Sequence, residues 1–215
     1  MELYEALHQI TAIRQQMAKS EVFRGYRSVT VGFSGLLGLF AASIQTEWVA
    51  APTEHLERYL ALWFFVAILS IVLVGLELYW RAFCIGSGMM KQMTISAVGQ
   101  FLPCILIGGL LTTCIFKAAP EVAWMLPGLW SLLFGLGIFS SYRMLPSPIC
   151  WVGAYYVLCG CGSLMFGQEE YPLSPWQMGI SFGGGQFIAA FCLYWTLERD
   201  DIVERNDSAE RNNAT

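Results

Sequence analysis

VAWMLPGLWSLLFGLGIFSSY, the stretch from Val122 to Tyr142, is the clearest indication of what kind of protein this chain forms. It has 21 residues and no charged side chain, and it lies between Glu121 and Arg143. At a rise of about 1.5 Å per residue, a helix of this length extends about 30 Å, the thickness of the hydrocarbon core of a bilayer. The stretch therefore predicts a transmembrane helix.

Five other stretches have the same character, and the composition agrees with them. Hydrophobic residues make up 56% of the 215 residues and charged residues only 13%, whereas soluble domains carry about 25% charged residues. Because so few polar groups cannot cover a soluble surface, lipid must solvate much of the folded chain. The predicted spans cover residues 29–44, 59–79, 93–116, 122–142, 149–166 and 175–197. We expect an all-α fold, a polytopic membrane bundle of six transmembrane helices.

An amphipathic helix is predicted to precede the first span. Five apolar residues recur at spacings of three and four and form one stripe at the helical period: Leu3, Leu7, Ile10, Ile13 and Met17. Such a helix either lies in the headgroup region or packs against another helix.

The chain is predicted to have three parts. Residues 1–28 form the cytoplasmic or interfacial segment with the amphipathic helix, and residues 29–197 form the transmembrane domain. Residues 198–215 are charged, rich in asparagine and almost without apolar side chains. This last segment is predicted to be a disordered cytoplasmic tail.

The distribution of lysine and arginine predicts the orientation in the membrane. Six spans put the N-terminal segment, the second and fourth connections and the tail on one side. That side carries ten of the 12 basic residues, and the other side carries only Arg58 and Lys117. Because basic residues concentrate on the cytoplasmic side, both termini are predicted to be cytoplasmic.

Small residues in two spans indicate close helix packing. Gly32, Gly35 and Gly38 recur every three residues in the first span, and Gly135 lies within the fourth. In lipid, small residues allow helix backbones to approach closely. We prefer this packing role to a phosphate-binding loop, because the spacing is different and no strand precedes it.

Four polar residues are candidate intramembrane positions: Gln100, Gln186, Glu77 and Thr112. Gln100 lies about nine residues inside its span, or about 13 Å deep. A buried amide in lipid needs a partner, so a role in linking helices is preferred to a substrate site. Glu77 lies in the last turn of its span, four residues before Arg81, and this spacing favours a local ion pair over a proton relay.

The sequence contains no pattern that predicts a catalytic, metal or cofactor site. Six of the seven cysteines lie in or at the edge of spans, and the two histidines, His8 and His55, lie in distant polar segments. Neither a C-x-x-C nor an H-E-x-x-H motif is present, and the serines within the spans have no buried base. We expect no enzyme activity. Nucleic acid is also excluded as a partner, because no basic cluster is available to neutralise phosphates.

A weak internal repeat supports a second hypothesis, a small-solute transporter. The tripeptide Gly-Gln-Phe occurs in the third span around Gln100 and in the sixth span around Gln186. The first and fourth spans share a serine followed by a glycine-rich core, which starts at Ser34 and at Ser131. Two halves of three spans each would have inverted topology, with the two glutamines approaching the midplane from opposite sides.

The motifs in their order along the chain resemble a family of uncharacterised bacterial six-span membrane proteins. The matching features are the opening stretch with the proline-containing turn after it, an I-x-x-I-R-x-x-M-x-x-S-x-x-F segment that starts at Ile10, and a third span with Pro103 and Leu111-Thr112. The resemblance covers about residues 10–197. It implies a bacterial inner membrane and no established activity. Similar proteins often have Gly-Gly-x-His where this chain has Gln186, and glutamine cannot titrate.

The predicted function is therefore that of a multi-pass inner-membrane protein without enzyme activity, acting as a regulatory or partner-docking component. Its expected partners are the lipid bilayer and either a cytoplasmic protein or further copies of the chain. The amphipathic stripe and the missing catalytic groups are the reasons for this preference.

Overall fold

The computed structural model describes residues 28–85, 88–141, 147–168 and 172–198. Within these ranges the structure is 90% helical and contains no β-strand, so the prediction of an all-α fold is confirmed. The predicted amphipathic helix at residues 2–20 and the predicted tail at 198–215 lie outside the described residues, except for Glu198.

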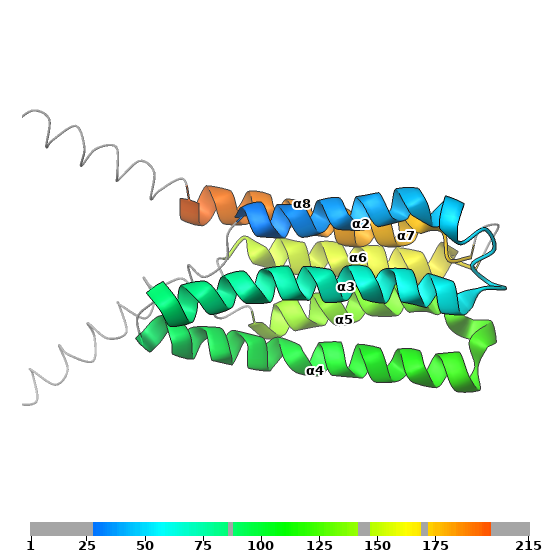
Figure 1. Cartoon of the computed structure of the whole chain (residues 1–215), viewed down its shortest axis with the longest axis horizontal. Helices are drawn as coiled ribbons and strands as arrows, with labels where there is room; N and C mark the ends of the chain where they lie inside the picture. Colours follow the sequence, from blue (N-terminus) through cyan, green and yellow to red (C-terminus); the bar gives the residue numbers. More distant parts are fainter. Residues whose placement is uncertain (1–27, 86–87, 142–146, 169–171, 199–215) are drawn as a thin grey trace, which may run out of the picture.

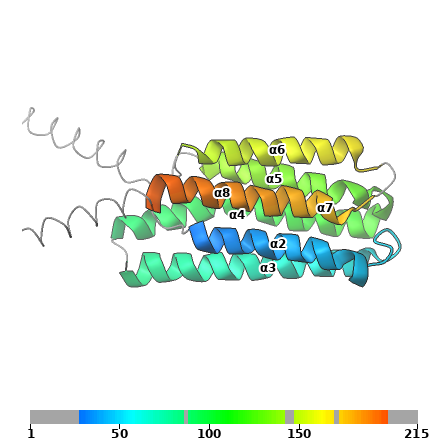
Figure 2. The same ribbon diagram turned by 90° about the horizontal axis from the view of Figure 1, so that it is seen from above.

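The helices run up and down along one long axis (Figure 1; Figure 2 gives the view from above). Three short π-helical elements (η1, η4 and η5) and one 3₁₀ element (η2) extend or interrupt the α-helices. In chain order the elements are α2 (Ser28–Trp48), α3 (Leu56–Tyr79), η1 (Trp80–Ile85), α4 (Gly88–Ala118), η2 (Pro120–Met125), α5 (Leu126–Ser141), α6 (Ile149–Phe166), α7 (Pro175–Met178), η4 (Gly179–Gly184), α8 (Gly185–Leu193) and η5 (Tyr194–Glu198).

Within the described ranges, five helices are long and apolar enough to cross a membrane, so the prediction of six spans is met only in part. They are Ser28–Trp48, Leu56–Cys84, Thr94–Ala118, Pro120–Ser141 and Ile149–Phe166. The sixth predicted span, 175–197, falls on α7, η4, α8 and η5, which follow one another without a gap. In this stretch π-helical turns divide the helix into shorter elements.

The two ends of the bundle differ in what they carry. Residues 49–55, 119–125 and 172–174 meet at one end, here called the loop end. The beginning of α2 and the end of the last helical stretch lie at the opposite end, here called the terminal end (Figure 1).

Glycines hold α5 and α6 together as the most extensive helix pair of the bundle. A Cβ atom on Gly128 would lie 2.9 Å from the carbonyl oxygen of Gly160, and the converse distance is also 2.9 Å. One contact further along, a Cβ atom on Gly135 would lie 3.1 Å from the carbonyl oxygen of Gly153. Backbone therefore packs directly on backbone, as small residues permit between helices in lipid.

A second close pair forms between α2 and the last helical stretch. A Cβ atom on Gly35 would lie 3.1 Å from the carbonyl oxygen of Gly183, and one on Gly38 would lie 3.5 Å from the backbone nitrogen of the same residue. Gly32 contacts the side chain of Ala190 in the same way, at 3.6 Å. The three glycines thus face η4 and α8, and they bring the first described helix against the last one (Figure 2).

Large apolar side chains cover the outside of the bundle. Leu106 and Leu110 on α4 are 63% and 67% exposed, and Leu158 on α6 is 72% exposed. Five tryptophans are also exposed, and all lie at helix ends: Trp48, Trp80, Trp151, Trp176 and Trp195. A surface of this kind is stable only where lipid or another apolar partner covers it.

Candidate functional site

The candidate intramembrane residue Thr112 links two helices. It is 2% exposed, and its hydroxyl donates to the carbonyl of Gly108 on its own helix over 2.7 Å. The same oxygen accepts a hydrogen bond of 2.8 Å from the indole nitrogen of Trp130 on α5. The Trp130 ring in turn meets Phe64 of α3 edge-on, with 5.9 Å between the ring centroids. Thr112 therefore connects α4 to α5 next to α3.

Gln186 lies at the beginning of α8, directly after the π-helical element η4. Its Cβ atom faces Gly35 of α2, and its amide interacts with the hydroxyl of Tyr156 on α6. A π-helical turn breaks the regular hydrogen-bond ladder and leaves carbonyl groups free for other donors. Here the hydroxyl of Tyr155 donates to the carbonyl of Ile180 over 2.7 Å, and that of Tyr156 to the carbonyl of Phe182 over 3.5 Å.

The run of three glycines before Gln186 makes room for these neighbours. A Cβ atom on Gly183 would come within 2.8 Å of Leu39 on α2. At Gly184 it would meet the Tyr155 hydroxyl, and at Gly185 the ring of Tyr156. The last helical stretch can therefore lie between α2 and α6 only because this turn has no side chains.

An aromatic cluster connects α4 with η4. Phe101 packs on Phe134 with ring centroids 5.0 Å apart, and Phe134 packs on Tyr156 at 4.7 Å and on Phe182 at 5.4 Å. Gln100 precedes Phe101 on α4, and its amide oxygen is buried without a hydrogen-bond partner among the described residues. Of the two candidate glutamines, Gln186 reaches the cluster through Tyr156, whereas Gln100 is connected to it only as the chain neighbour of Phe101.

Glu77 lies in the last turn of α3, near the terminal end, where its side chain is partly exposed. The side chain of Arg81, its predicted ion-pair partner, lies outside the described residues.

A buried polar clamp at the loop end was not predicted from the sequence. Gln45 on α2 is 1% exposed, and its amide nitrogen donates to the carbonyl of Leu173 over 2.9 Å. Its amide oxygen accepts a hydrogen bond of 2.9 Å from the indole nitrogen of Trp63 on α3. Leu173 has a φ of 59°, a strained backbone conformation for a residue other than glycine. The clamp fixes this turn against two helices.

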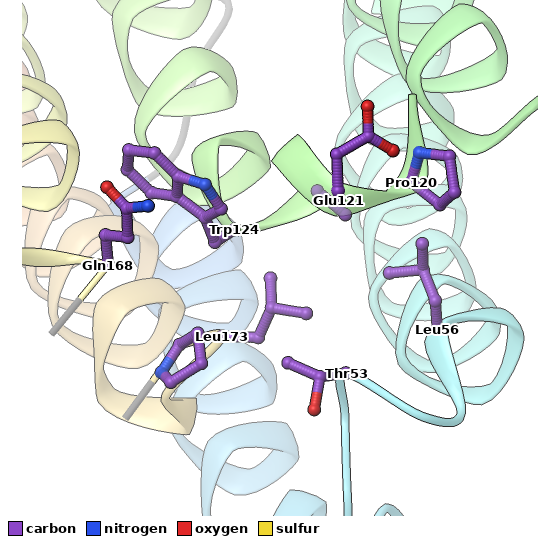
Figure 3. Close-up of a pocket in the computed structure, with 9 residues that line it drawn as sticks. Thr53, Leu56, Pro120, Glu121, Trp124, Gln168 and Leu173 are labelled. Atoms are coloured by element: carbon purple, nitrogen blue, oxygen red, sulfur yellow. The ribbon is translucent and has the colours of Figure 1, made fainter. Parts of the chain in front are cut away.

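A pocket of about 290 Å³ opens beside this clamp (Figure 3). Its floor consists of three buried apolar residues, Leu56, Ala123 and Leu173. The remaining lining residues come from three separate segments: Thr53, Pro120, Glu121, Trp124, Gln168 and Pro172. Among the described residues that line the pocket, Glu121 alone carries a charge.

Two properties of the sequence explain why its patterns do not indicate these residues. Gln45 lies one position beyond the predicted end of the first span and so falls in the predicted loop. The pocket combines segments separated by up to 120 positions, from Thr53 to Leu173, and no spacing pattern connects them. The one sequence feature that could indicate the clamp is the uncharged amide of Gln45, which stands between an apolar span and Trp48.

The chain has no matching protein-family model, and no similar protein is found among the curated proteins or the solved structures. The resemblance to a bacterial six-span family therefore depends on the sequence motifs alone.

Proposed function

We propose that this chain is an integral membrane protein that crosses the bilayer six times and acts by binding, as a regulatory or partner-docking component. The positions of the exposed tryptophans are the observation that supports six crossings. Trp48 and Trp176 lie at the loop end, and Trp80, Trp151 and Trp195 lie at the terminal end. Tryptophan concentrates at the two membrane–water interfaces, so two such belts support a bundle that spans the membrane.

The last helical stretch fits the same two belts. Trp176 and Trp195 are nineteen positions apart, or about 28 Å along a helix, close to the thickness of the hydrocarbon core. The stretch also runs beside α2, from the contact of Gly179 with Ala42 to that of Ala190 with Gly32. Since α2 is itself a candidate span, the neighbouring stretch shares its depth in the membrane.

The orientation follows from an even number of crossings. Ser28 and Glu198 lie at the same end of the bundle (Figure 1), and the segments beyond them contain most of the basic residues. By the preference of basic residues for the cytoplasmic side, this terminal end is cytoplasmic. The resemblance to a bacterial six-span family favours an inner membrane as the location. The loop end, with its pocket, then faces outward.

A binding role is supported by how the polar groups of the interior are used. The hydroxyls of Ser34, Ser131 and Ser141 each donate to a carbonyl of their own helix. Thr112 and Gln45 accept from Trp130 and Trp63, and so tie neighbouring helices together. These groups serve the architecture of the bundle, and the segment with the amphipathic stripe remains as the surface for a cytoplasmic partner or a second copy.

The topology is tested with single cysteines in a variant that lacks the seven native ones. Gln168→Cys and Asn206→Cys stand before and after the sixth crossing. We expect a membrane-impermeant thiol reagent, applied to intact cells, to label Gln168→Cys and to label Asn206→Cys only after the cells are opened. Labelling of both from the same side would contradict six crossings.

The docking role is tested at the amphipathic stripe. Ile10→Glu places a charge on the stripe, and Gln9→Glu, its matched control, places the same charge beside it. We expect in-cell cross-linking to lose its specific adducts, to protein or to a second copy, in Ile10→Glu and to keep them in Gln9→Glu. Both variants must reach the membrane at the level of the original chain. The same adducts in both variants would refute the role.

A solute transporter is the second candidate, and two matching contacts favour it. Phe101, after Gln100, has its ring against Gly137 of α5, and Phe187, after Gln186, has its ring against Gly35 of α2. The repeated tripeptide thus makes the same kind of contact in both halves, as inverted repeats would. Reaction of Gln100→Cys and Gln186→Cys with thiol reagents from opposite sides of the membrane would support transport. Failure of both to react would exclude it.

A further inference from the structure

Two groups of three helices make up the bundle, and one side between the groups is weakly closed. In the first group α2 packs on α3 and on the last helical stretch, and in the second α5 packs on α4 and α6. Contacts of α6 with η4 and α8 join the two groups. Between α3 and α4 the main connection runs through η1, and direct packing of the two helices is slight. This side of the bundle is where a further molecule could enter.

Two bridges hold α3 and α4 together. At the loop-side bridge, Trp130 of α5 contacts Phe64 of α3 and donates to Thr112 of α4. At the terminal-side bridge, the ammonium group of Lys91 on α4 lies 4.5 Å from the ring centre of Phe83. Phe83 belongs to η1, which continues α3. The two helices are therefore linked at two separate levels.

Between the bridges, the side of α3 that carries the loop-side bridge is exposed. Phe64, Ile71 and Leu78 are seven residues apart, which is about two helical turns, so they share one face. Leu78 is 7% exposed and Phe64 contacts Trp130, but Ile71 between them is 51% exposed. One turn further along, a Cβ atom on Gly75 would meet no atom within 4 Å. The described helices thus leave the middle of this face uncovered.

The corresponding side of α4 has the same pattern. Lys91, Val98, Ile105 and Thr112 are also seven residues apart and lie along one face. Thr112 is buried at the loop-side bridge, whereas Ile105 is 41% and Val98 45% exposed. Because the two helices run in opposite directions (Figure 1), Ile71 and Ile105 both lie about 10 Å from the loop-side bridge. These exposed residues therefore flank one opening, here called the α3–α4 opening.

The width of the α3–α4 opening favours a lipid chain over a protein helix. A single side chain, that of Trp130, reaches both Phe64 and Thr112. The two helices are therefore separated at this level by about one side chain, whereas a helix with its side chains is about 10–12 Å across. An extended acyl chain is narrow enough to enter, and the exposed side chains along the opening are aliphatic.

A positive charge stands at the terminal end of this opening. Lys91 is exposed and lies three residues before the candidate span that begins at Thr94, at the level expected for lipid headgroups. Among the described residues its ammonium group contacts the Phe83 ring and pairs with no carboxylate. Glu77 lies about 120° around α3 from Ile71. An ammonium group has three donors, so Lys91 can also bind the phosphate of an anionic lipid.

We infer that the α3–α4 opening binds one anionic phospholipid from the leaflet at the terminal end, with its phosphate on Lys91 and one acyl chain against Ile71, Val98 and Ile105. Half of the hydrocarbon core is about 15 Å thick, or about ten helical residues. A chain that starts at the level of Thr94 therefore passes Val98 and ends near Ile105. The inference rests on the membrane-spanning orientation proposed above, but not on the docking role.

The headgroup is tested by native mass spectrometry of the full chain in maltoside micelles. Phosphatidylglycerol is compared with phosphatidylcholine that has the same acyl chains. We expect one phosphatidylglycerol per chain, bound about fivefold more tightly than phosphatidylcholine. Lys91→Gln should remove this preference and Lys91→Arg should keep it. Lys117→Gln changes the other lysine of α4, at the loop end, and is the matched control that should also keep it.

The acyl chain is tested by filling the α3–α4 opening. Ile71→Trp places a large side chain in it, and we expect phosphatidylglycerol to bind about tenfold more weakly. Leu76→Trp places the same side chain about 140° away around α3, on a face that is already exposed. This control variant should bind phosphatidylglycerol as the original chain does.

Cross-linking of the original chain needs no variant and so does not depend on the folding of one. A phosphatidylglycerol with a photoreactive group in its acyl chain is added to phosphatidylcholine nanodiscs. We expect adducts at Ile71, Val98 or Ile105 that excess phosphatidylglycerol suppresses, whereas adducts at Phe65 and Leu76 should persist. The result is separate from the labelling of the sixth crossing, because α3 and α4 are both candidate spans.

Three outcomes would overturn the inference. The first is equal binding of phosphatidylglycerol and phosphatidylcholine by the original chain. The second is the same loss of preference in Lys117→Gln as in Lys91→Gln. The third is the absence of suppressible adducts in the α3–α4 opening, including the case of a lipid-free dimer in which a second copy covers it.

Discussion

The indole nitrogen of Trp63 and the backbone carbonyl of Leu173 are joined by one side chain, the amide of Gln45, through two hydrogen bonds of 2.9 Å each. Trp63 is on α3, Gln45 is on α2, and Leu173 precedes the last helical stretch. One buried amide thus satisfies a donor and an acceptor from two other parts of the chain. All three residues are at most 3% exposed.

Replacement of Gln45 by leucine is expected to lower the free energy of unfolding by about 2–4 kcal/mol. The change leaves two buried polar groups without partners, and each costs about 1–3 kcal/mol. Unfolding in detergent micelles, followed by circular dichroism, measures the effect. Gln92→Leu, on an exposed position of α4, is the control and should change stability by less than about 0.5 kcal/mol. Equal effects of both variants would contradict a structural role of the clamp.

Thr112→Val is expected to destabilise the bundle, whereas Thr113→Val is not. Valine keeps the shape of threonine but removes the acceptor for the Trp130 indole, at a cost of about 1–2 kcal/mol. Thr113 is exposed, and its hydroxyl donates only to the carbonyl of Gly109 on its own helix. The difference between the two midpoints of unfolding measures the link between α4 and α5. A difference near zero would show that this hydrogen bond is replaced at no cost.

Gly160→Ala and Gly162→Ala are expected to act in opposite directions, although they are two residues apart on α6. A methyl group on Gly160 would lie 2.9 Å from the backbone oxygen of Gly128, which cannot move without shifting α5. We expect a loss of about 1–3 kcal/mol. At Gly162 no atom lies within 4 Å, and alanine favours the helix there by about 0.5–1 kcal/mol. The same direction of change in both variants would refute the α5–α6 packing.

Tyr155→Phe is expected to loosen the π-helical element η4. The variant removes the donor to the carbonyl of Ile180, which lies 2.7 Å from the Tyr155 hydroxyl. We expect faster amide hydrogen exchange in residues 179–184 and a loss of about 1 kcal/mol in stability. The rate of amide hydrogen exchange in α3, which does not contact Tyr155, serves as the internal reference. Unchanged exchange in η4 would mean that the tyrosine is not what satisfies this carbonyl.

The fold class could be predicted from the sequence because it depends on local properties. Apolar runs of 16 or more residues and a low charge content are sufficient for an all-helical chain with membrane-crossing helices. The same local signal does not detect the π-helical turns of the last stretch. The turn η4 is contacted by Tyr155 and Tyr156, which lie more than 20 positions earlier and donate to the carbonyls of Ile180 and Phe182.

The candidate site was predictable only where a polar residue stands out within an apolar run. Gln100, Gln186 and Thr112 stand out in this way, whereas no sequence pattern indicates the residues that surround them. Trp130 lies on the predicted fourth span, and its indole nitrogen donates to Thr112, a partner that no spacing pattern in the sequence indicates. The pocket contains no unusual residue, and it exists only because three connections meet at the loop end.

The spacing of the α5–α6 contacts limits how the molecule can move. The close contacts at Gly128 and Gly135 on one helix, and at Gly153 and Gly160 on the other, are seven residues apart on each. Seven residues correspond to about 10 Å of helix, so any smaller sliding of one helix along the other would drive a side chain into backbone. The pair of α5 and α6 therefore resists sliding, and a rearrangement of the bundle is expected where α4 and the last helical stretch meet it.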